Sequence, residues 1–599
     1  MNKKLTFLLL SLLCGLALPA RAQWVTETLT LKAGWNAVYL HVNASHVTLD
    51  QLVGPSAPVV TPIQQVWRWN PNPATAQFVQ SPQQPLDTGS QWSQWRRSGG
   101  ASSTLERLTG NAAYLIYTTT DYTWTVKGQP VIPDYRWSTS GLNFFGFPTV
   151  GTGAPTFESF LADVPSLQFS EIYRYPGGEF GPTNPGRLWA LLTTPVRRGQ
   201  AFWIRAGDVY NNYFGPFEIT AAGAGRAAFG DSLSSYSFRI RNQTASPLTV
   251  KMKLVASEAP PTGQPAIVAI PPLLVRGALN TTNLTHGVSE LPQNGFQEWL
   301  LQPHGLQGSE LEVVIGLDRA AITANPGQLL AGILQLTDSL GQTRIDLAVS
   351  ANPASQAGLW VGTAAVTHVG QYLQSYLRGN TNQLILQTNG AYVVTGVITN
   401  LTPVPTPFPL RLIIHNPGTG PATLMQRVYF GLNAATNPVV ANKESAIAPG
   451  LISAARRLSA THLPWSEENS GWPLSGPLHQ GAVVTTRLTN SFTDQSSNPF
   501  LHTYHPDHDN LNSRFKAELP QGSESFTLVR ELTLRVQPPA PDFNSRVSAG
   551  LALNGEYIET LLVKGLPRPG GTSDTRRFDS KGVFQLNRIS EIPTLTRVP

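Results

Sequence analysis

Short runs of alternating apolar and polar residues recur along the chain and are separated by turns rich in Gly and Pro. Examples are AVYLHV from Ala37, AAYLIYTT from Ala112 and SFTLVRELTLRVQ from Ser525. Alternation with a period of two is typical of strands with one buried face, and Val, Tyr, Ile and Thr favour strands. The pattern therefore predicts an all-β protein.

Two segments of the N-terminal third repeat the same landmarks in the same order. Residues 34–36 and 141–143 both have the form Gly-x-Asn, and VWRW at 66–69 matches IYRY at 172–175. Such self-similarity indicates a duplicated module. We therefore predict two small β-rich repeat modules, at 23–133 and 134–220.

Each copy also contains a short helical pattern, TLDQLV from Thr48 and TFESFL from Thr156. The threonine at the start of each pattern can act as the helix N-cap, because its hydroxyl accepts a hydrogen bond from a free backbone N–H group. We therefore expect one short helix in each module.

The aromatic residues of the modules allow two interpretations. They fill the core, since large rings bury much apolar surface, or exposed rings form a platform that stacks sugars or another protein. Core packing is favoured for most of them, whereas Trp92 and Trp95, which the second copy lacks, are the better candidates for exposure. The candidate ligand-binding residues are Trp67, Trp69, Trp92, Trp95, Tyr173 and Tyr175.

These landmarks resemble a repeat of uncharacterised secreted multidomain β-sandwich proteins of bacteria. There a Gly-Trp-Asn strand opens the module, an aromatic-x-aromatic strand follows, and a Gly-x-x-Tyr-Trp-type strand closes it. The first copy has Gly-Trp-Asn at 34–36 and closes on Tyr114, whereas the second departs at Leu142 and closes on Trp203. The resemblance covers about residues 24–220 and implies an extracellular β-rich domain without known catalysis.

The rest of the chain predicts two further β regions. Residues 221–230 are small and typical of a linker. Beyond them, 236–255 predicts a hairpin, and alternating strands flank a turn at 338–341, which is the arrangement of an immunoglobulin-like sandwich. We therefore predict an immunoglobulin-like β-sandwich at 231–352 and a larger C-terminal β-sandwich region at 353–599, of one domain or two, with one short helix at 452–460.

The first 22 residues have the pattern of a secretory signal peptide. Two lysines precede an apolar stretch, and Ala-Arg-Ala at 20–22 supplies a small-x-small cleavage site. A lipoprotein signal at Cys14 is the alternative, although Leu13 is larger than the residue that such a site requires. The apolar stretch is shorter than a membrane span. We therefore expect cleavage after Ala22, a periplasmic, extracellular or cell-surface location, and no transmembrane segment in the mature chain.

Composition and charge exclude several functional classes. Charged residues make up 13% of the chain, about half of the ~25% that is usual for soluble domains. Lys and Arg number 42 against 36 Asp and Glu, without a basic cluster longer than two, which argues against nucleic-acid binding. Cys14 is the single cysteine, so the predicted mature chain has neither a catalytic thiolate nor a cysteine-ligated zinc.

One segment, HTYHPDHD, concentrates side chains that bind metals. Imidazoles and carboxylates together suit Zn or Mn, and paired aspartates suit Ca. The alternative is a solvated loop whose polar residues cap turns. The candidate ligands of a divalent ion are His502, His505, Asp507, His508 and Asp509.

Three functional hypotheses follow. The leading one is an exported, non-catalytic surface, matrix or adhesion protein whose partners are surface proteins or polysaccharide. The second is a secreted carbohydrate-binding protein that uses exposed aromatic residues of the repeats. The third is a metal-dependent hydrolase centred on His502–Asp509, but no motif such as H-E-x-x-H, a P-loop or G-x-S-x-G supports an enzyme.

Overall fold

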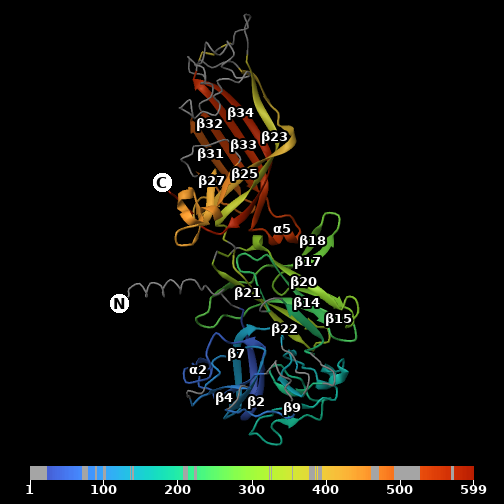
Figure 1. Cartoon of the computed structure of the whole chain (residues 1–599). Coiled ribbons are helices and arrows are strands. Elements are labelled where there is room, and N and C mark those ends of the chain that lie inside the picture. Colours follow the sequence, from blue (N-terminus) through green and yellow to red (C-terminus); the bar gives the residue numbers. More distant parts are fainter. Residues whose placement is uncertain are drawn as a thin grey trace, which may run out of the picture. The chain divides into compact units, whose positions relative to one another are not determined.

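The computed structural model describes residues 23–70, 79–87, 91–98, 103–134, 137, 141–206, 213–221, 225–322, 324–325, 327–353, 355–376, 385, 387–388, 394–460, 471–491, 527–567 and 573–598. This part of the chain is all-β, as predicted, with several antiparallel sheets and a few very short helices (Figure 1). None of the helices that it contains has the length and hydropathy of a transmembrane span.

The chain divides into two compact units. The first comprises Met1–Ala354 together with Asp542–Val547, and the second comprises Ser355–Pro541 together with Ser548–Pro599. The first unit therefore holds both repeats and the predicted sandwich. The finer domain boundaries within it stay predictions.

The two repeats have four-stranded sheets with the same strand order, which is the structural counterpart of the repeat in the sequence. In the first repeat the order is β2 (Gly34–Leu40), β6 (Ala112–Thr118), β4 (Ile63–Trp69) and β5 (Trp92–Arg96). In the second it is β8 (Leu142–Phe145), β11 (Phe202–Arg205), β9 (Ile172–Arg174) and β10 (Gly186–Arg187). The first repeat has a further sheet of β1 (Val25–Leu31), β7 (Tyr122–Pro130) and β3 (Val42–Asn43).

Each repeat also contains the predicted short helix with its threonine cap. In α2 (Leu49–Leu52) the backbone N–H of Gln51 donates to the Thr48 hydroxyl over 3.2 Å. In α3 (Phe157–Phe160) the Ser159 amide donates to Thr156 over 3.3 Å. The hydroxyl satisfies an N–H group that the first turn leaves unpaired.

Aromatic side chains from both repeats pack into one core. The ring centroids of Trp69 and Trp203 lie 5.1 Å apart, and those of Phe144 and Trp203 lie 4.5 Å apart in a stacked pair. Along β4 the side chains of Trp67 and Trp69 join this shared core, whereas Val66 packs into a second core inside the first repeat. The alternating side chains of VWRW thus pack into two different cores on opposite faces of β4.

A two-sheet sandwich follows the repeats. One sheet has the order β12 (Phe217–Ala221), β14 (Ser235–Asn242), β20 (Glu310–Leu317), β17 (Leu273–Asn280) and β18 (Thr285–Leu291). The other has the order β13 (Arg226–Ala228), β22 (Arg344–Ala351), β21 (Leu329–Asp338), β15 (Leu248–Ala256) and β19 (Phe296–Leu301), and β16 (Ile267–Ala269) also pairs with β21. Their apolar faces enclose one core.

The sandwich departs from the sequence-based predictions in two places. The strands predicted within 236–255 exist, but β14 and β15 lie in different sheets, so they do not form a hairpin. The segment 221–230, predicted as a linker, contains β13, which pairs with β22 around the buried Ala227. The hairpin around 338–341 is confirmed, since β21 pairs antiparallel with β22.

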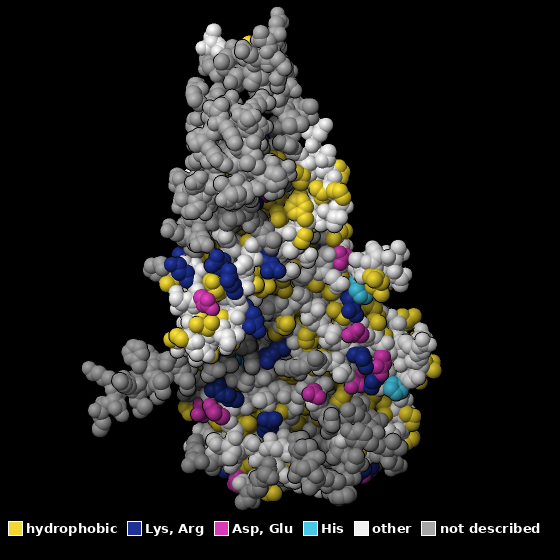
Figure 2. All heavy atoms as spheres, turned by 45° about the horizontal axis from the view of Figure 1, so that its top comes forward, with side chains coloured by type: hydrophobic (Ala, Val, Ile, Leu, Met, Phe, Trp, Pro, Cys, Tyr) yellow, Lys and Arg dark blue, Asp and Glu magenta, His cyan; other side chains and the backbone are white. Residues whose placement is uncertain are grey.

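Cross-strand ion pairs cover part of the outer face of the sandwich. Arg241 pairs with Glu310 over 2.6 Å, and Arg276 pairs with Glu312 over 3.1 Å. Figure 2 shows acidic and basic side chains side by side on the described part of one face. Exposed pairs of this kind each add only ~0–1 kcal/mol of stability, so the sandwich depends on its apolar core.

A short helix, α5 (Phe543–Val547), completes the first unit. It is contributed by the connection between β32 (Thr527–Val536) and β33 (Ala552–Pro567). Its side chains Phe543 and Val547 are buried against Leu274 and Val314. A segment distant in sequence therefore covers the sheet formed by β17, β18 and β20.

The second unit is a nearly closed eight-stranded sheet with a smaller sheet beside it. The large sheet has the order β30 (Trp472–Pro473), β26 (Thr423–Leu424), β25 (Thr402–Asn416), β23 (Gly358–Tyr376), β34 (Ser573–Ser590), β33, β32 and β31 (Val483–Ser491), and β24 (Val394–Thr399) also pairs with β23. Ser475 and Thr485 exchange two backbone hydrogen bonds of 2.7 and 2.8 Å, which bring the two ends of the sheet together.

The smaller sheet of this unit has the order β29 (Arg456–Ser459), β27 (Arg427–Leu432), β28 (Pro438–Ala441) and β35 (Leu595–Thr596). The short helix predicted at 452–460 is wrong over most of its length. A 3₁₀ helix, Pro449–Ala454, ends there, and β29 follows it and pairs with β27. Sheet pairing has overridden the helix propensity of this Ala- and Arg-rich segment.

Candidate functional site

The predicted metal ligands, His502–Asp509, lie outside the residues that the structure describes, so this site stays a prediction. Within the described ranges, no group of three or more His, Cys, Asp or Glu side chains could hold a metal ion.

The predicted ligand-binding aromatics are largely buried. Trp92 and Trp95 are only 7% and 3% exposed, so the expectation that they face solvent is wrong. Trp92 packs into the core shared by the repeats, and the Trp95 indole N–H donates to Asp50 over 2.8 Å. The other members of the set are the buried Trp67, Trp69 and Tyr175 and the half-buried Tyr173.

Among the described residues, two other aromatic rings of the second repeat are exposed instead, and one of them, Phe169, is 92% exposed. Trp189 in the second repeat is 78% exposed, and the Arg187 guanidinium lies 4.2 Å from its ring centroid. Its neighbours in the sequence, RLWALL, show no alternation that would predict exposure.

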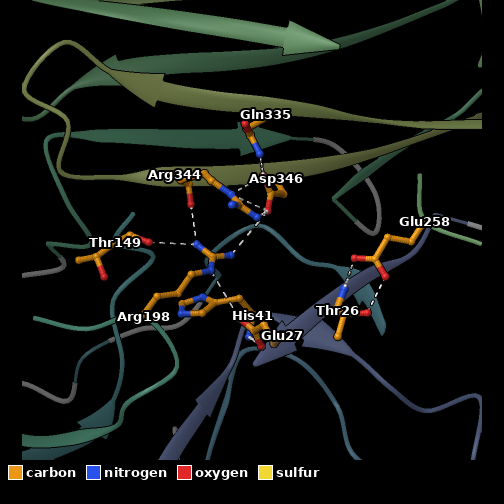
Figure 3. A network of polar contacts seen from close by, with 9 residues as sticks. All are labelled: Thr26, Glu27, His41, Thr149, Arg198, Glu258, Gln335, Arg344 and Asp346. Carbon is orange, nitrogen blue, oxygen red and sulfur yellow. Dashed lines mark hydrogen bonds and ion pairs between the residues drawn. The ribbon is translucent and has the colours of Figure 1, made fainter. Parts of the chain in front are cut away.

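A buried cluster of charged side chains joins three parts of the first unit (Figure 3). Arg198 precedes β11 of the second repeat. Its guanidinium lies 3.5 Å from Glu27 on β1 and 3.7 Å from Asp346 on β22 of the sandwich. The same guanidinium donates to the backbone oxygen of Arg344 over 2.8 Å. One side chain therefore contacts both repeats and the sandwich.

The acidic members of the cluster are held by several donors. The Glu27 carboxylate accepts the backbone N–H of His41 over 3.0 Å. The Asp346 carboxylate accepts two hydrogen bonds of 3.1 Å from Nε of Arg344 and one of 2.8 Å from Nη2. Charged groups are buried at low cost only when they are paired in this way.

Burial shifts the protonation equilibria of the cluster. Loss of solvation raises the pKa of Glu27 to about 7, although the charge of Arg198 works in the opposite direction. Burial also lowers the pKa of His41 well below its usual value, and Arg198 adds to this effect. His41 is therefore neutral, and Glu27 exchanges its proton near neutral pH.

A groove of about 770 Å³ lies beside this cluster, along the free edge of β1. Its volume falls within the ~300–1,000 Å³ that is typical of ligand sites. Among the described residues that line it, Glu27 is acidic and buried, whereas the basic ones are Lys32, Arg174, Arg197, Arg198 and Arg344. The groove therefore favours negatively charged ligands.

Sequence reasoning missed the charged residues of this cluster and groove, although Tyr175, one of the predicted ligand-binding aromatics, lines the groove. Glu27 shares the buried face of β1 with Leu29 and Leu31, so an acid on an apolar face was the available signal. Its partners Arg198 and Asp346 lie far away in the sequence, and no local pattern connects them.

Comparisons with known proteins add little. No family model and no curated protein matches the chain. Among solved structures, the crystal structure of the Pseudomonas aeruginosa CupB2 chaperone aligns with 37% of this chain and 97% of that chain, at 9% identity and a TM-score of 0.13. A TM-score this low carries no argument about fold or function.

Proposed function

We propose that the chain is an exported, non-catalytic surface, matrix or adhesion protein built from serial β domains. The observation that carries the proposal is the cluster around Arg198, where buried charged side chains connect the two repeats and the sandwich. A series of β modules with an open groove suits binding to a partner.

Export is tested first, through the predicted signal peptide. N-terminal sequencing of the protein from the outer fractions of its cells should start at Gln23. Replacing both Ala20 and Ala22 with Asp should block cleavage, whereas Arg21→Ala keeps the small-x-small pattern and should be processed normally. A chain that stays in the cytoplasm with Met1 in place would contradict the proposal, and a lipid-modified start at Cys14 would replace the cleavage site.

Binding at the cell surface is tested second. The purified mature chain should bind intact cells or their isolated outer material, and binding should be lost when surface proteins are removed by protease. Retention of binding after protease treatment would point to polysaccharide as the partner. No binding to either material would contradict the adhesion function.

Trp189 favours carbohydrate binding as a second candidate function. Its ring is exposed, and exposed indole rings stack well against apolar faces. On a glycan array, Trp189→Ala should abolish binding by the mature chain. An exposed-residue control, Leu192→Ala, should not change it, and an empty array would remove this candidate.

A further inference from the structure

The edge of β1 that faces the groove is unpaired along its centre. In its sheet β1 pairs only with β7. The Thr26 N–H donates to the Glu258 carboxylate over 2.9 Å, and the Lys32 N–H donates to the Asn36 side chain over 2.8 Å, so both point away from β7. Because N–H and C=O groups alternate along an antiparallel strand, those of Thr28 and Thr30 also point away from β7.

Both ends of this edge are already occupied by side chains that imitate a neighbouring strand. Asn36 accepts the Lys32 N–H and donates to the Lys32 oxygen over 2.7 Å, as a backbone amide of a paired strand would. At the other end the Glu258 carboxylate accepts from both N and Oγ1 of Thr26 (Figure 3). Between them, the outward groups of Thr28 and Thr30 have no partner among the described residues.

The groove leaves room for an additional strand at this edge. Its lining includes Gly151 and Gly153, where an added Cβ would meet nothing within 4 Å. Pro176 and Pro195 also line it, and neither has an N–H group to offer β1. A strand added to this edge would run ~4.7–4.9 Å from β1.

Two arginines are the main reason why the groove should bind negatively charged groups. Arg174 and Arg197 line it, and neither has a carboxylate partner within 4.0 Å in the described part of the chain. Lys32 and Arg344, by contrast, are paired with Asp121 and Asp346. The two unpaired guanidinium groups can therefore bind incoming carboxylates, as β1 itself binds that of Glu258.

We propose that the edge of β1 binds an extended segment of a partner protein that carries acidic side chains at alternate positions. The segment adds to the sheet of β1, β7 and β3 as a further strand. Its backbone pairs with Thr28 and Thr30, and its carboxylates pair with Arg174 and Arg197. This inference rests on the proposed function, because it names the partner class of a binding protein.

The first test uses a synthetic peptide of alternating Thr and Glu, ten residues long and blocked at both ends, with calorimetry on the mature chain. The peptide should bind, and binding should weaken as salt rises. A Thr-Gln peptide should bind at least about fivefold more weakly, and a Thr-Lys peptide should not bind. Equal binding of all three, or none by the Thr-Glu peptide at millimolar concentration, would overturn the proposal.

N-methylation of the peptide tests strand pairing without altering the protein. Methyl groups on the Thr nitrogens block one edge of the extended peptide, and methyl groups on the Glu nitrogens block the other. One methylated peptide should lose at least about tenfold in affinity and the other should lose much less, because only one edge can face β1. Equal affinities would exclude pairing. Heparin, an anionic polysaccharide without a peptide backbone, should bind weakly; displacement of the peptide by heparin at equal affinity would show a general anion site.

Variants test the arginines. Arg174→Gln with Arg197→Gln should weaken binding of the Thr-Glu peptide by about tenfold, because two ion pairs are lost. Arg276→Gln, on β17, is the matched control and should change affinity less than twofold. If no peptide binds but the mature chain is found outside the cell, the edge proposal fails and the proposed function stands. If the chain stays in the cytoplasm but binds the peptide, the proposed function fails and the edge proposal stands.

Discussion

Arg198 joins three parts of the first unit through separate polar contacts. It lies among Glu27, Asp346 and two backbone oxygens from three parts of the unit, with its own side chain only 12% exposed. Removing one member of a buried charged cluster leaves the others without compensation. The cost of losing Arg198 should therefore exceed that of losing an exposed arginine.

We predict that Arg198→Met lowers the free energy of unfolding of the first unit by about 3–5 kcal/mol. The adjacent Arg197→Met removes the same charge from an exposed position and should change it by no more than about 0.5 kcal/mol. Urea unfolding followed by tryptophan fluorescence measures both, because most tryptophans lie in the first unit. Equal effects would show that Arg198 does not join the modules.

Glu27 should make stability depend on pH. Its pKa is about 7 in the folded chain and ~4.3 when unfolded, so its contribution to stability is complete below about pH 4 and is lost as pH rises to about 7. His41 has a lowered pKa, so its contribution is lost as pH falls below ~6.5. Arg198, Asp346 and Arg344 also face Glu27.

Comparison with Glu27→Gln separates these effects, because Gln resembles the protonated acid and leaves His41 unchanged. From pH 5 to pH 8 the variant should gain roughly 2–3 kcal/mol in unfolding free energy relative to the natural chain. Urea titrations at both pH values measure this difference. Parallel pH profiles of the two proteins would place the pKa of Glu27 near its ordinary value.

Strands and short helices were predictable because their causes are local. The alternation of VWRW predicts strand β4 and its two faces from neighbouring residues alone. The threonines at 48 and 156 likewise predict where the two short helices start. Pairing was less predictable: β14 and β15 are adjacent in sequence but belong to opposite sheets, because a short connection can either turn within a sheet or cross between sheets. Likewise, Trp92 is buried because it packs in a core shared with the second repeat, and the local sequence of β5 does not predict that contact.

The contact between β2 and the second repeat depends on close backbone approach. Gly34 has φ +92°, and an added Cβ would lie 2.4 Å from the backbone of Gly178, whose oxygen accepts the Trp35 N–H over 2.8 Å. Gly178 has φ +86° with open space around a Cβ.

We predict that Gly34→Ala costs about 2–4 kcal/mol of unfolding free energy, because strain at positive φ adds to a backbone clash. The control Gly178→Ala carries the strain alone and should cost about 1–2 kcal/mol. Urea unfolding of both variants measures the difference. Equal costs would show that Gly34 does not lie as close to the backbone of Gly178 as the structure indicates.

The two compact units share a chain that crosses between them more than once. Residues 542–547 belong to the first unit, although the strands on either side belong to the second. Sequence patterns identified α5 neither as a helix nor as part of the sandwich, because its partners Leu274 and Val314 lie more than two hundred residues away. The first unit is therefore complete only when the later part of the chain has been made.

Phe543→Ala in the mature chain should destabilise the first unit by about 3 kcal/mol, since it removes a buried ring that packs on Leu274 and Val314. Phe296→Ala removes a half-exposed ring from the same unit and should cost less than about 1 kcal/mol. Tryptophan fluorescence during urea unfolding reports the first unit. An unchanged midpoint for Phe543→Ala would show that α5 does not belong to it.

Amide hydrogen exchange along β1 is the most direct test of the central claim, that this chain is a binding protein with an open sheet edge in its first unit. In the free mature chain, the amides of Thr28 and Thr30 should exchange much faster than those of Leu29 and Leu31, which face β7. Addition of the Thr-Glu peptide should slow exchange at Thr28 and Thr30. Slow exchange at these two residues before the peptide is added, or no change afterwards, would contradict the account.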